Sequence, residues 1–319
     1  PSPNPSLGYA IGVLDQLKSG PSPSTPVVLF LSDWSATVQN ACYSDVKGVA
    51  ASFDLLIGAL KSIAPAFMDT VIVVKQSEAI LKDPSNYWIS VINAGRHFNL
   101  NKTQEGIDDS EPVGGVIARL MRVADAISLA PKSIAYASGG RHSSKIEADL
   151  VKAFYEETEV PLELPEFLPC EDNKDLTLHD LEDEVHATEN ARYYLLDDPK
   201  VHGKAKIKKA FAEPGNVDFA PVIDLAAVFA LKYGEGKLSV ERSEENGGNV
   251  EYKSVGGMGG MMEDFKSEKL HPGDLKAAMT KVMVELFSKM VAAQKADKGL
   301  LGATKTLKQL NKKNSKKKN

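Results

Sequence analysis

The sequence predicts an α/β protein with a Rossmann-like, doubly wound parallel sheet, followed by a mostly helical second domain. Short apolar runs alternate with helical patterns in the first half of the chain, and the pattern beyond Lys200 is mostly helical. Between them, residues 163–190 carry ten acidic side chains and a single lysine, which is typical of a connector. A chain of 319 residues commonly forms two domains.

Strands and helices alternate from the start of the chain. The expected strands are PVVLFLSD (residues 26–33), TVIVVK (70–75) and SIAYAS (133–138), and the expected helices cover residues 46–63, 87–98 and 116–127. This alternation indicates parallel strands joined by helical crossovers. Doubly wound sheets bind ligands beyond the carboxyl ends of their strands, so we expect a site at the loops after Leu31 and Ser138.

The C-terminal half is dominated by one long amphipathic helix. Its apolar positions recur at helical spacing: Leu275, Ala278, Met279, Val282, Met283, Leu286, Phe287 and Met290. The glycine-rich stretch VGGMGGMM, residues 255–262, breaks this periodicity and is expected to be a flexible loop.

Charge is distributed unevenly. The net charge is −5, yet residues 266–319 contain fourteen lysines and four acids, a local excess of +10 that suits a polyanion. The final NKKNSKKKN is expected to be disordered, either as a solubilising tail or as an RNA contact. No apolar run is long enough to cross a bilayer and the two cysteines are far apart, so we expect a cytoplasmic protein without a membrane partner.

The stretch EKLHPGDLKAAM, residues 268–279, predicts the start of a helix. His271 would be the N-cap, Pro272 needs no hydrogen-bond partner in the first turn, and Asp274 faces the positive end of the helix dipole. Good capping alone explains this pattern.

Familiar enzyme motifs are missing. The sequence has no HExxH, GxSxG, Walker A or well-placed GxGxxG pattern. His179 and His186 lie among acids, which we interpret as a solvated loop rather than a metal site. The stretch SGGRHSSK, residues 138–145, is either an anion-binding nest or a tight turn.

Three C-terminal motifs resemble the anticodon-binding domain of eukaryotic and archaeal tyrosyl-tRNA synthetases. They are KKAFAEPGNV (residues 208–217), GGN (247–249) and HPGDLK (271–276). Fainter resemblances precede them: PSLGYAIGVLDQL (5–17) to the ATP signature, GGVIARLMRVAD (114–125) to the tyrosine-pocket helix, and SGGRHSSKI (138–146) to the second substrate loop.

The resemblance implies an RNA-binding role for the helix start. It assigns contact with the first anticodon base to His271 and Asp274, while Asn246 stands where the family usually has a stacking aromatic. Such stacking contributes about 1 to 3 kcal/mol per base. Lys269 and Lys276 would attract the tRNA backbone without specificity.

The same resemblance predicts a degenerate catalytic site. The family's histidine turn reads Ser6-Leu7-Gly8-Tyr9 here, with Ser6 at the first histidine position. Losing one such donor costs about 2.7 to 4 kcal/mol of transition-state stabilisation. The lysine loop is replaced by acidic sequence that would repel ATP. Remnants of the substrate site are Ala118, Arg122 and Asp125 on the pocket helix and Gly139, Gly140 and Ser143 in the second loop, with Asp125 at the position of the tyrosine-hydroxyl partner.

We therefore expect four segments. They are a degenerate class I catalytic domain (1–165), an acidic connector (166–199), an anticodon-binding domain (200–304) and a basic disordered tail (305–319). The predicted function is a non-catalytic part of a tyrosine-tRNA ligase. This part would bind tRNA(Tyr) and pair with another synthetase half, but hold no ATP, magnesium or other metal.

Pro1 falls inside what should be the loop after the family's first strand, so the chain looks like the second copy of a double-length synthetase. Three alternatives stay open. They are an active synthetase that uses substitute residues, an interaction module outside translation, and a plain nucleotide-binding protein.

Overall fold

The computed structural model describes residues 1–20, 25–108, 111–139, 144–170, 176–179 and 190–318. Its N-terminal half contains four strands in two hydrogen-bonded parallel pairs. β1 (Val28–Leu31) pairs with β2 (Ile72–Lys75), and β3 (Ser133–Ala137) pairs with β4 (Glu166–Cys170). The predicted parallel strands are therefore confirmed, and a fourth strand joins them.

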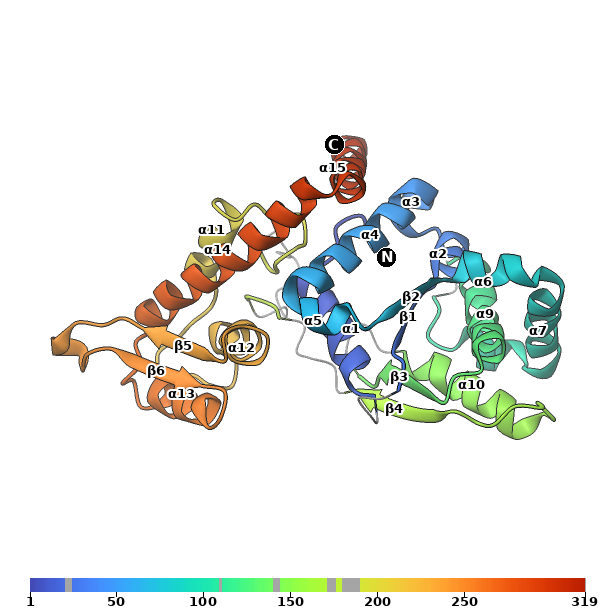
Figure 1. Ribbon diagram of the computed structural model, residues 1–319, viewed down its shortest axis with the longest axis horizontal. Helices are drawn as coiled ribbons and strands as arrows, with labels where there is room; N and C mark the ends of the chain where they lie inside the picture. Colours follow the sequence, from blue (N-terminus) through green and yellow to red (C-terminus); the bar gives the residue numbers. More distant parts are fainter. Residues whose placement is uncertain (21–24, 109–110, 140–143, 171–175, 180–189, 319) are drawn as a thin grey trace.

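The helices of the N-terminal half lie on both sides of these strands (Figure 1). They are α1 (Leu7–Lys18), α2 (Asp33–Val38), α3 (Ala41–Ser44), α4 (Val46–Ile63), α5 (Pro65–Met68), α6 (Gln76–Lys82), α7 (Pro84–His97), α8 (Leu100–Gln104), α9 (Gly114–Leu129) and α10 (Lys145–Glu157). Three of them, α4, α7 and α9, cover the predicted helical stretches.

Two apolar layers hold this half together. Leu29 and Leu31 of β1 belong to the same buried cluster as the apolar faces of α1 and α4. On the other side, Ile134 of β3 and Phe167 of β4 pack against a cluster formed by α7, α9 and α10. Helices therefore cover the strands from two sides, as in a doubly wound arrangement, although Val28 of β1 and Ile72 and Val73 of β2 stay exposed.

The C-terminal half combines helices with one small hairpin. Its helical elements are α11 (His202–Lys209), α12 (Pro221–Ala226), the π-helix η2 (Ala227–Lys232), the 3₁₀ turn η3 (Glu244–Asn246), α13 (Gly257–Lys266), α14 (Pro272–Ala296) and α15 (Lys298–Lys318). β5 (Lys237–Val240) pairs antiparallel with β6 (Val250–Lys253), so the loop between them carries the GGN triplet.

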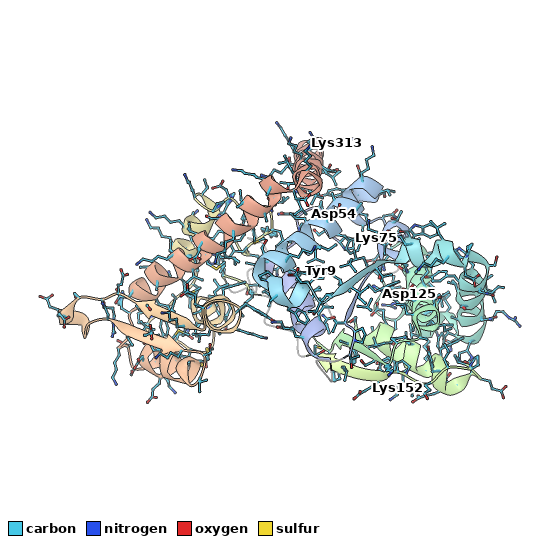
Figure 2. The ribbon with its side chains drawn as sticks, viewed as in Figure 1. Tyr9, Asp54, Lys75, Asp125, Lys152 and Lys313 are labelled. Atoms are coloured by element: carbon cyan, nitrogen blue, oxygen red, sulfur yellow. The ribbon has the colours of Figure 1, made fainter. Side chains whose placement is uncertain are left out.

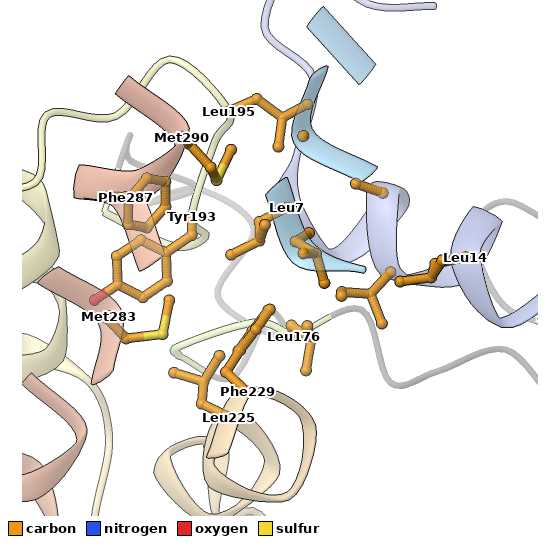
Figure 3. Packing of buried hydrophobic residues seen from close by; sticks show 14 of the residues in the cluster. Leu7, Leu14, Leu176, Tyr193, Leu195, Leu225, Phe229, Met283, Phe287 and Met290 are labelled. Carbon is orange, nitrogen blue, oxygen red and sulfur yellow. The ribbon is translucent and has the colours of Figure 1, made fainter. Parts of the chain in front are cut away.

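A single apolar cluster joins the two halves. Figure 3 shows Met283, Phe287 and Met290 of α14 around Tyr193, with Leu7 of α1 nearby. The rings of Tyr193 and Phe287 lie 5.3 Å apart between centroids. These methionines are core residues, as the sequence predicted, because Met283 is fully buried and Met290 is 2% exposed.

Polar contacts strengthen the same junction. Residues 5–7 pair with the segment around Tyr194, since Leu7 N donates to Tyr193 O and Leu195 N donates to Pro5 O. Lys206 of α11 is 1% exposed, and its Nζ donates to Asp197 Oδ2 at 2.6 Å and to Arg192 O at 2.7 Å. A buried lysine requires such partners, so this contact fixes the segment beside the start of α1.

Three sequence expectations need correction. The glycine-rich stretch 255–262 is not a loop throughout, because α13 begins at Gly257 and buries Met261 and Phe265. Residues 166–170, assigned to the connector, form β4 and pair with β3. The tail expected to be disordered is helical to Lys318, and α15 packs along α4. Much of the acidic connector, residues 171–175 and 180–189, lies outside the described residues.

Candidate anticodon-binding and remnant catalytic sites

The helix start predicted from HPGDLK is present. His271 has an extended backbone and caps α14, with its Nδ1 accepting a hydrogen bond from Gly273 N at 3.0 Å. Asp274 lies in the first turn and is half-buried, with no ion-pair partner within 4.0 Å in the described part of the chain. We call the start of α14, residues 271–274, the mouth of this helix. It offers an exposed imidazole edge and a carboxylate at the positive end of a long helix.

Arg242 connects this mouth to the GGN triplet. Its Nε donates to Gly248 O at 2.9 Å, its Nη1 donates to Lys269 O at 2.7 Å, and its backbone N donates to Asn249 Oδ1 at 2.9 Å. Gly247 and Gly248 both have positive φ angles, 91° and 71°, which explains why glycines occupy the turn. Sequence reasoning missed Arg242, because both side-chain bonds end on backbone carbonyls.

The motif KKAFAEPGNV (residues 208–217) contacts the start of α14 through Lys276. Its Nζ donates to Lys208 O at 3.4 Å, and burial lowers the pKa of this lysine. The pKa of His179, in the described segment 176–179, is lowered first by burial and then by the charge of Lys276. Lys269 is exposed, as a backbone-binding lysine would be. Asn246 is the last residue of η3, beside the GGN turn, and its side chain is outside the described part.

The residues predicted to be remnants of a catalytic site include a buried polar cluster around Asp125. This carboxylate is 5% exposed, and Gln76 Nε2 lies 2.8 and 2.9 Å from its two oxygens. Tyr87 donates its hydroxyl to Asp125 Oδ1 at 2.8 Å. Gln76 is in turn held by Ser35, whose backbone N donates to Gln76 Oε1 at 2.8 Å. The aspartate therefore already receives hydrogen bonds from side chains of its own chain.

Electrostatics around Asp125 reflect this burial. Burial raises the pKa of Asp125, while the charge of Arg122 and the hydrogen bonds from Gln76 and Tyr87 act in the opposite direction. Burial and the adjacent carboxylate raise the pKa of Tyr87, so its phenol stays protonated and can donate. Arg122 Nη1 lies 3.8 Å from Asp125 Oδ2 and also donates to Ser32 Oγ, just after β1.

Ser6 and Tyr9, which the resemblance assigns to the histidine positions of the family's turn, lie at the start of α1. Ser6 Oγ caps α1 by accepting from Tyr9 N at 3.1 Å. Tyr9 is half-buried against the main core, and burial raises the pKa of its phenol (Figure 2). Gly8 is also half-buried. Neither Ser6 nor Tyr9 carries a positive charge at neutral pH, so this turn presents no cation.

The other remnants are only partly described. Ala118 is buried on α9, and Gly139 follows β3 with open space around it. Gly140 and Ser143 lie outside the described residues. Lys145, which follows them, forms a 3.0 Å ion pair with Asp149. No group of three or more potential metal ligands occurs among the residues that the structure covers. His186 lies outside these described residues.

Known proteins are similar to this chain in sequence and in fold. The chain is 23% identical over 297 residues to the tyrosine-tRNA ligase of Picrophilus torridus, covering 90% of this chain and 86% of that protein. It is 39% identical over 100 residues to the cytoplasmic tyrosine-tRNA ligase of Xenopus laevis, covering 31% of this chain and 18% of that protein. No protein-family profile matches the chain.

Among solved structures, Leishmania major tyrosyl-tRNA synthetase in complex with tyrosinol superposes with a TM-score of 0.79 at 27% identity. The match covers 98% of this chain but 44% of the Leishmania chain. The enzyme of Pyrococcus horikoshii, complexed with L-tyrosine, superposes with a TM-score of 0.78 at 17% identity, covering 96% of this chain and 88% of that chain.

The fold is that of the class I aminoacyl-tRNA synthetases, with parallel strands followed by a helical C-terminal region. Among proteins of this fold, the chain is similar to tyrosyl-tRNA synthetases of archaea and eukaryotes.

Proposed function

We propose that this chain binds tRNA(Tyr) through the mouth of α14 and does not itself activate tyrosine. The observation that carries the proposal is the contrast between its two polar sites. His271 and Asp274 lie at an ordered helix start that Arg242 ties to the GGN turn. Asp125, by contrast, accepts hydrogen bonds from Gln76 and Tyr87 of its own chain. The anticodon roles of His271, Asp274 and Asn246, and the backbone roles of Lys269 and Lys276, are part of this proposal.

The catalytic half lacks the donors that adenylate chemistry needs. Class I synthetases stabilise the negative charge that develops on the ATP phosphates, and Ser6 and Tyr9 supply no cation there. Each missing donor of this kind reduces the rate by roughly a hundred- to a thousandfold. The acidic sequence from Glu171 to Asn190 contains eight carboxylates where the family has a lysine loop. We infer that this chain holds neither ATP nor magnesium.

A second synthetase half is the proposed protein partner. The Leishmania chain is more than twice as long as the part that this chain matches, which suits a chain of two synthetase halves. Apolar side chains are available for pairing, because Ile89 (53% exposed) and Ile92 (58% exposed) lie one turn apart on α7, and Leu81 of the preceding helix α6 is 66% exposed. Contiguous exposed apolar side chains mark interaction surfaces. Ile92→Glu should abolish association with an intact half in sedimentation velocity; unchanged association would remove this surface from the proposal.

The cytoplasm is the proposed location. The Xenopus relative is named as a cytoplasmic enzyme. Among the helices that are described here, none combines the length and the apolar character needed to cross a membrane.

The competing function is an active tyrosyl-tRNA synthetase that uses substitute residues. Arg122 favours it, because its guanidinium lies at Ser32, beyond the carboxyl end of β1, where such sheets bind ligands. Tyrosine-dependent exchange between ATP and pyrophosphate decides the matter. We expect exchange no higher than for a chain with Arg122→Gln. Exchange well above that background would overturn the inactive assignment.

A synthetase-derived module outside translation is the other alternative. Its discriminating measurement is tRNA binding by the whole chain, with tRNA(Tyr) compared with a tRNA of different anticodon. We expect a preference for tRNA(Tyr) that depends on Asp274. Equal binding of both RNAs would favour the module and end the anticodon assignment.

A further inference from the structure

The C-terminal helix α15 is a fixed part of the fold. Leu307 is fully buried and Leu310 is 9% exposed, and the helix packs along α4. Two glycines of α4 permit this approach. A Cβ added at Gly58 would lie 2.9 Å from Leu300 Cδ1, and one at Gly48 would lie 2.8 Å from Leu310 Cδ2. Asn311 Nδ2 also donates to Pro3 O at 2.9 Å. The apolar face of α15 is therefore occupied.

Lysines cover the opposite face of the same helix. Lys305, Lys308, Lys312 and Lys313 are all exposed, and Figure 2 shows Lys313 at the outer edge of the molecule. The helix sequence KGLLGATKTLKQLNKKNSKKK contains no acid. None of the four lysines has an ion-pair partner within 4.0 Å among the described residues. The hydrogen bond from the N–H of Val201 is the main cause of the lowered pKa of Asp198, and the charge of Lys308 adds a small contribution.

The lysines of the neighbouring helix behave differently. On α14, Lys281 pairs with Glu241 at 2.8 Å and Lys289 pairs with Glu285 at 2.7 Å. Two of the four lysines of α14 are thus paired with acids, whereas the four named lysines of α15 have no acid within 4.0 Å in the described part of the chain. A rigid array of exposed, uncompensated lysines attracts phosphates by releasing the counterions that condense on a nucleic acid.

We propose that the lysine face of α15, defined by Lys305, Lys308, Lys312 and Lys313, is a second RNA-binding surface that contacts the tRNA backbone outside the anticodon loop. This inference rests on the proposed tRNA-binding function. α14 has 25 residues and separates the two surfaces, so its length of about 37 Å, at 1.5 Å per residue, keeps α15 away from the anticodon mouth. One elongated RNA would have to span both.

A membrane surface fits this helix less well. Helices that lie on membranes insert an apolar face between the lipids while their basic face meets the headgroups. Here that apolar face packs on α4, and no large apolar side chain is exposed on the part of α15 whose side chains are described. Charge without an inserting face favours RNA.

The test compares two charge-matched variants of the whole chain. Lys305→Gln/Lys312→Gln removes two lysines from the α15 face, and Lys132→Gln/Lys152→Gln removes two exposed lysines elsewhere, with Lys152 on α10 (Figure 2). Binding of tRNA(Tyr) and of its isolated anticodon stem-loop is measured between 50 and 200 mM salt. Thermal melting checks that both variants are folded.

Each lost phosphate contact lowers the slope of log affinity against log salt by about 0.7 to 0.9. We therefore expect the α15 variant to lower the slope for whole tRNA by roughly 1.4 to 1.8. The loss of affinity between the two salt concentrations then becomes about 7- to 12-fold smaller. Stem-loop binding should not change, and the control variant should resemble the unmodified chain with both RNAs.

Three outcomes overturn the inference: equal effects of the two variants, an equal effect on whole tRNA and stem-loop, or, in a parallel measurement with phosphatidylserine vesicles, a loss of vesicle binding without a loss of tRNA binding. The same measurements distinguish failure of this inference from failure of the proposed tRNA-binding function. If Asp274→Ala weakens binding of both RNAs while the α15 variant does not, only this inference fails. If the unmodified chain shows no preference for tRNA(Tyr), both fail.

Discussion

The two polar sites of this molecule direct their hydrogen bonds differently. Around Asp125, Gln76 and Tyr87 come from distant parts of the sequence and donate inward to one buried carboxylate. At the mouth of α14, backbone groups do most of the ordering, since Gly273 N donates to His271 and two carbonyls accept from Arg242. The side chain of Asp274 remains half-exposed.

This difference shows which kind of site tolerates sequence change. A helix start needs an N-cap, a permissive first turn and a dipole, all of which local sequence supplies. A catalytic site needs particular donors at the positions where charge develops, so the substitution that we propose at residue 6 would remove the contribution of one donor. Changes at the mouth should therefore alter RNA affinity, whereas changes at Asp125 should alter mainly stability.

The largest effect is expected from Asp274→Ala. Hydrogen bonds to a charged group contribute about 1.5 to 3 kcal/mol, so affinity for tRNA(Tyr) should fall roughly 10- to 100-fold. Filter binding or fluorescence anisotropy at fixed salt measures this loss. Glu263→Ala removes an exposed acid from α13 in the same domain and serves as the control. A similar loss in both variants, or none in Asp274→Ala, would exclude a specific base contact.

A smaller effect is expected from Arg242→Gln. The shorter, uncharged side chain cannot reach both Gly248 O and Lys269 O, so the GGN turn would no longer be fixed to the mouth. Neutral hydrogen bonds contribute about 0.5 to 1.5 kcal/mol, which predicts a roughly 3- to 10-fold weaker affinity. Discrimination against a changed first anticodon base should also decrease, without a change in the salt slope.

Arg242→Lys separates positioning from charge. Lysine keeps the positive charge but lacks the planar fork that serves two carbonyls at once. We expect it to behave like the glutamine variant in anticodon discrimination. Full recovery by lysine, together with a steeper salt slope than Arg242→Gln, would mean that Arg242 acts through its charge on RNA.

Sequence periodicity predicted the strongly amphipathic elements well. The pattern over residues 46–63 matches α4 to the residue, because Asp45 caps the helix and the apolar face is uninterrupted. The pattern failed where tertiary packing overrides propensity. α13 contains three glycines, yet buried Met261 and Phe265 hold it in place, and lysine-rich α15 is ordered by contact with α4.

The hairpin and β4 were missed for another reason. β5, β6 and β4 have only four or five residues each, and Glu166 and Pro169 make the last of these resemble connector sequence. Likewise, the partners of Asp125 could not be deduced from the sequence. Gln76 is 49 residues away and Tyr87 is 38 residues away, so only the fold brings them together.

The smallest predicted effect concerns Asp125→Asn. Burial raises the pKa of this carboxyl above its value in the unfolded chain, which is near 3.9. Between those two values the folded state binds more protons, so stability falls as the pH rises through this window, and the deficit persists above it. Asparagine cannot ionise and can still accept from Gln76. The variant should therefore lack this fall and match or exceed the unmodified chain at pH 7, by at most about 1 kcal/mol.

Urea unfolding at a series of pH values from 4 to 8 measures this difference. Asp149→Asn changes an exposed carboxyl on α10 and should keep the pH dependence of the unmodified chain. Binding of tRNA(Tyr) should be the same in all three chains, because Asp125 lies in the half that we assign no RNA contact. A loss of more than about 2 kcal/mol in Asp125→Asn at pH 7 would show that the ionised carboxylate is an essential acceptor. The two polar sites would then not divide into one for stability and one for binding.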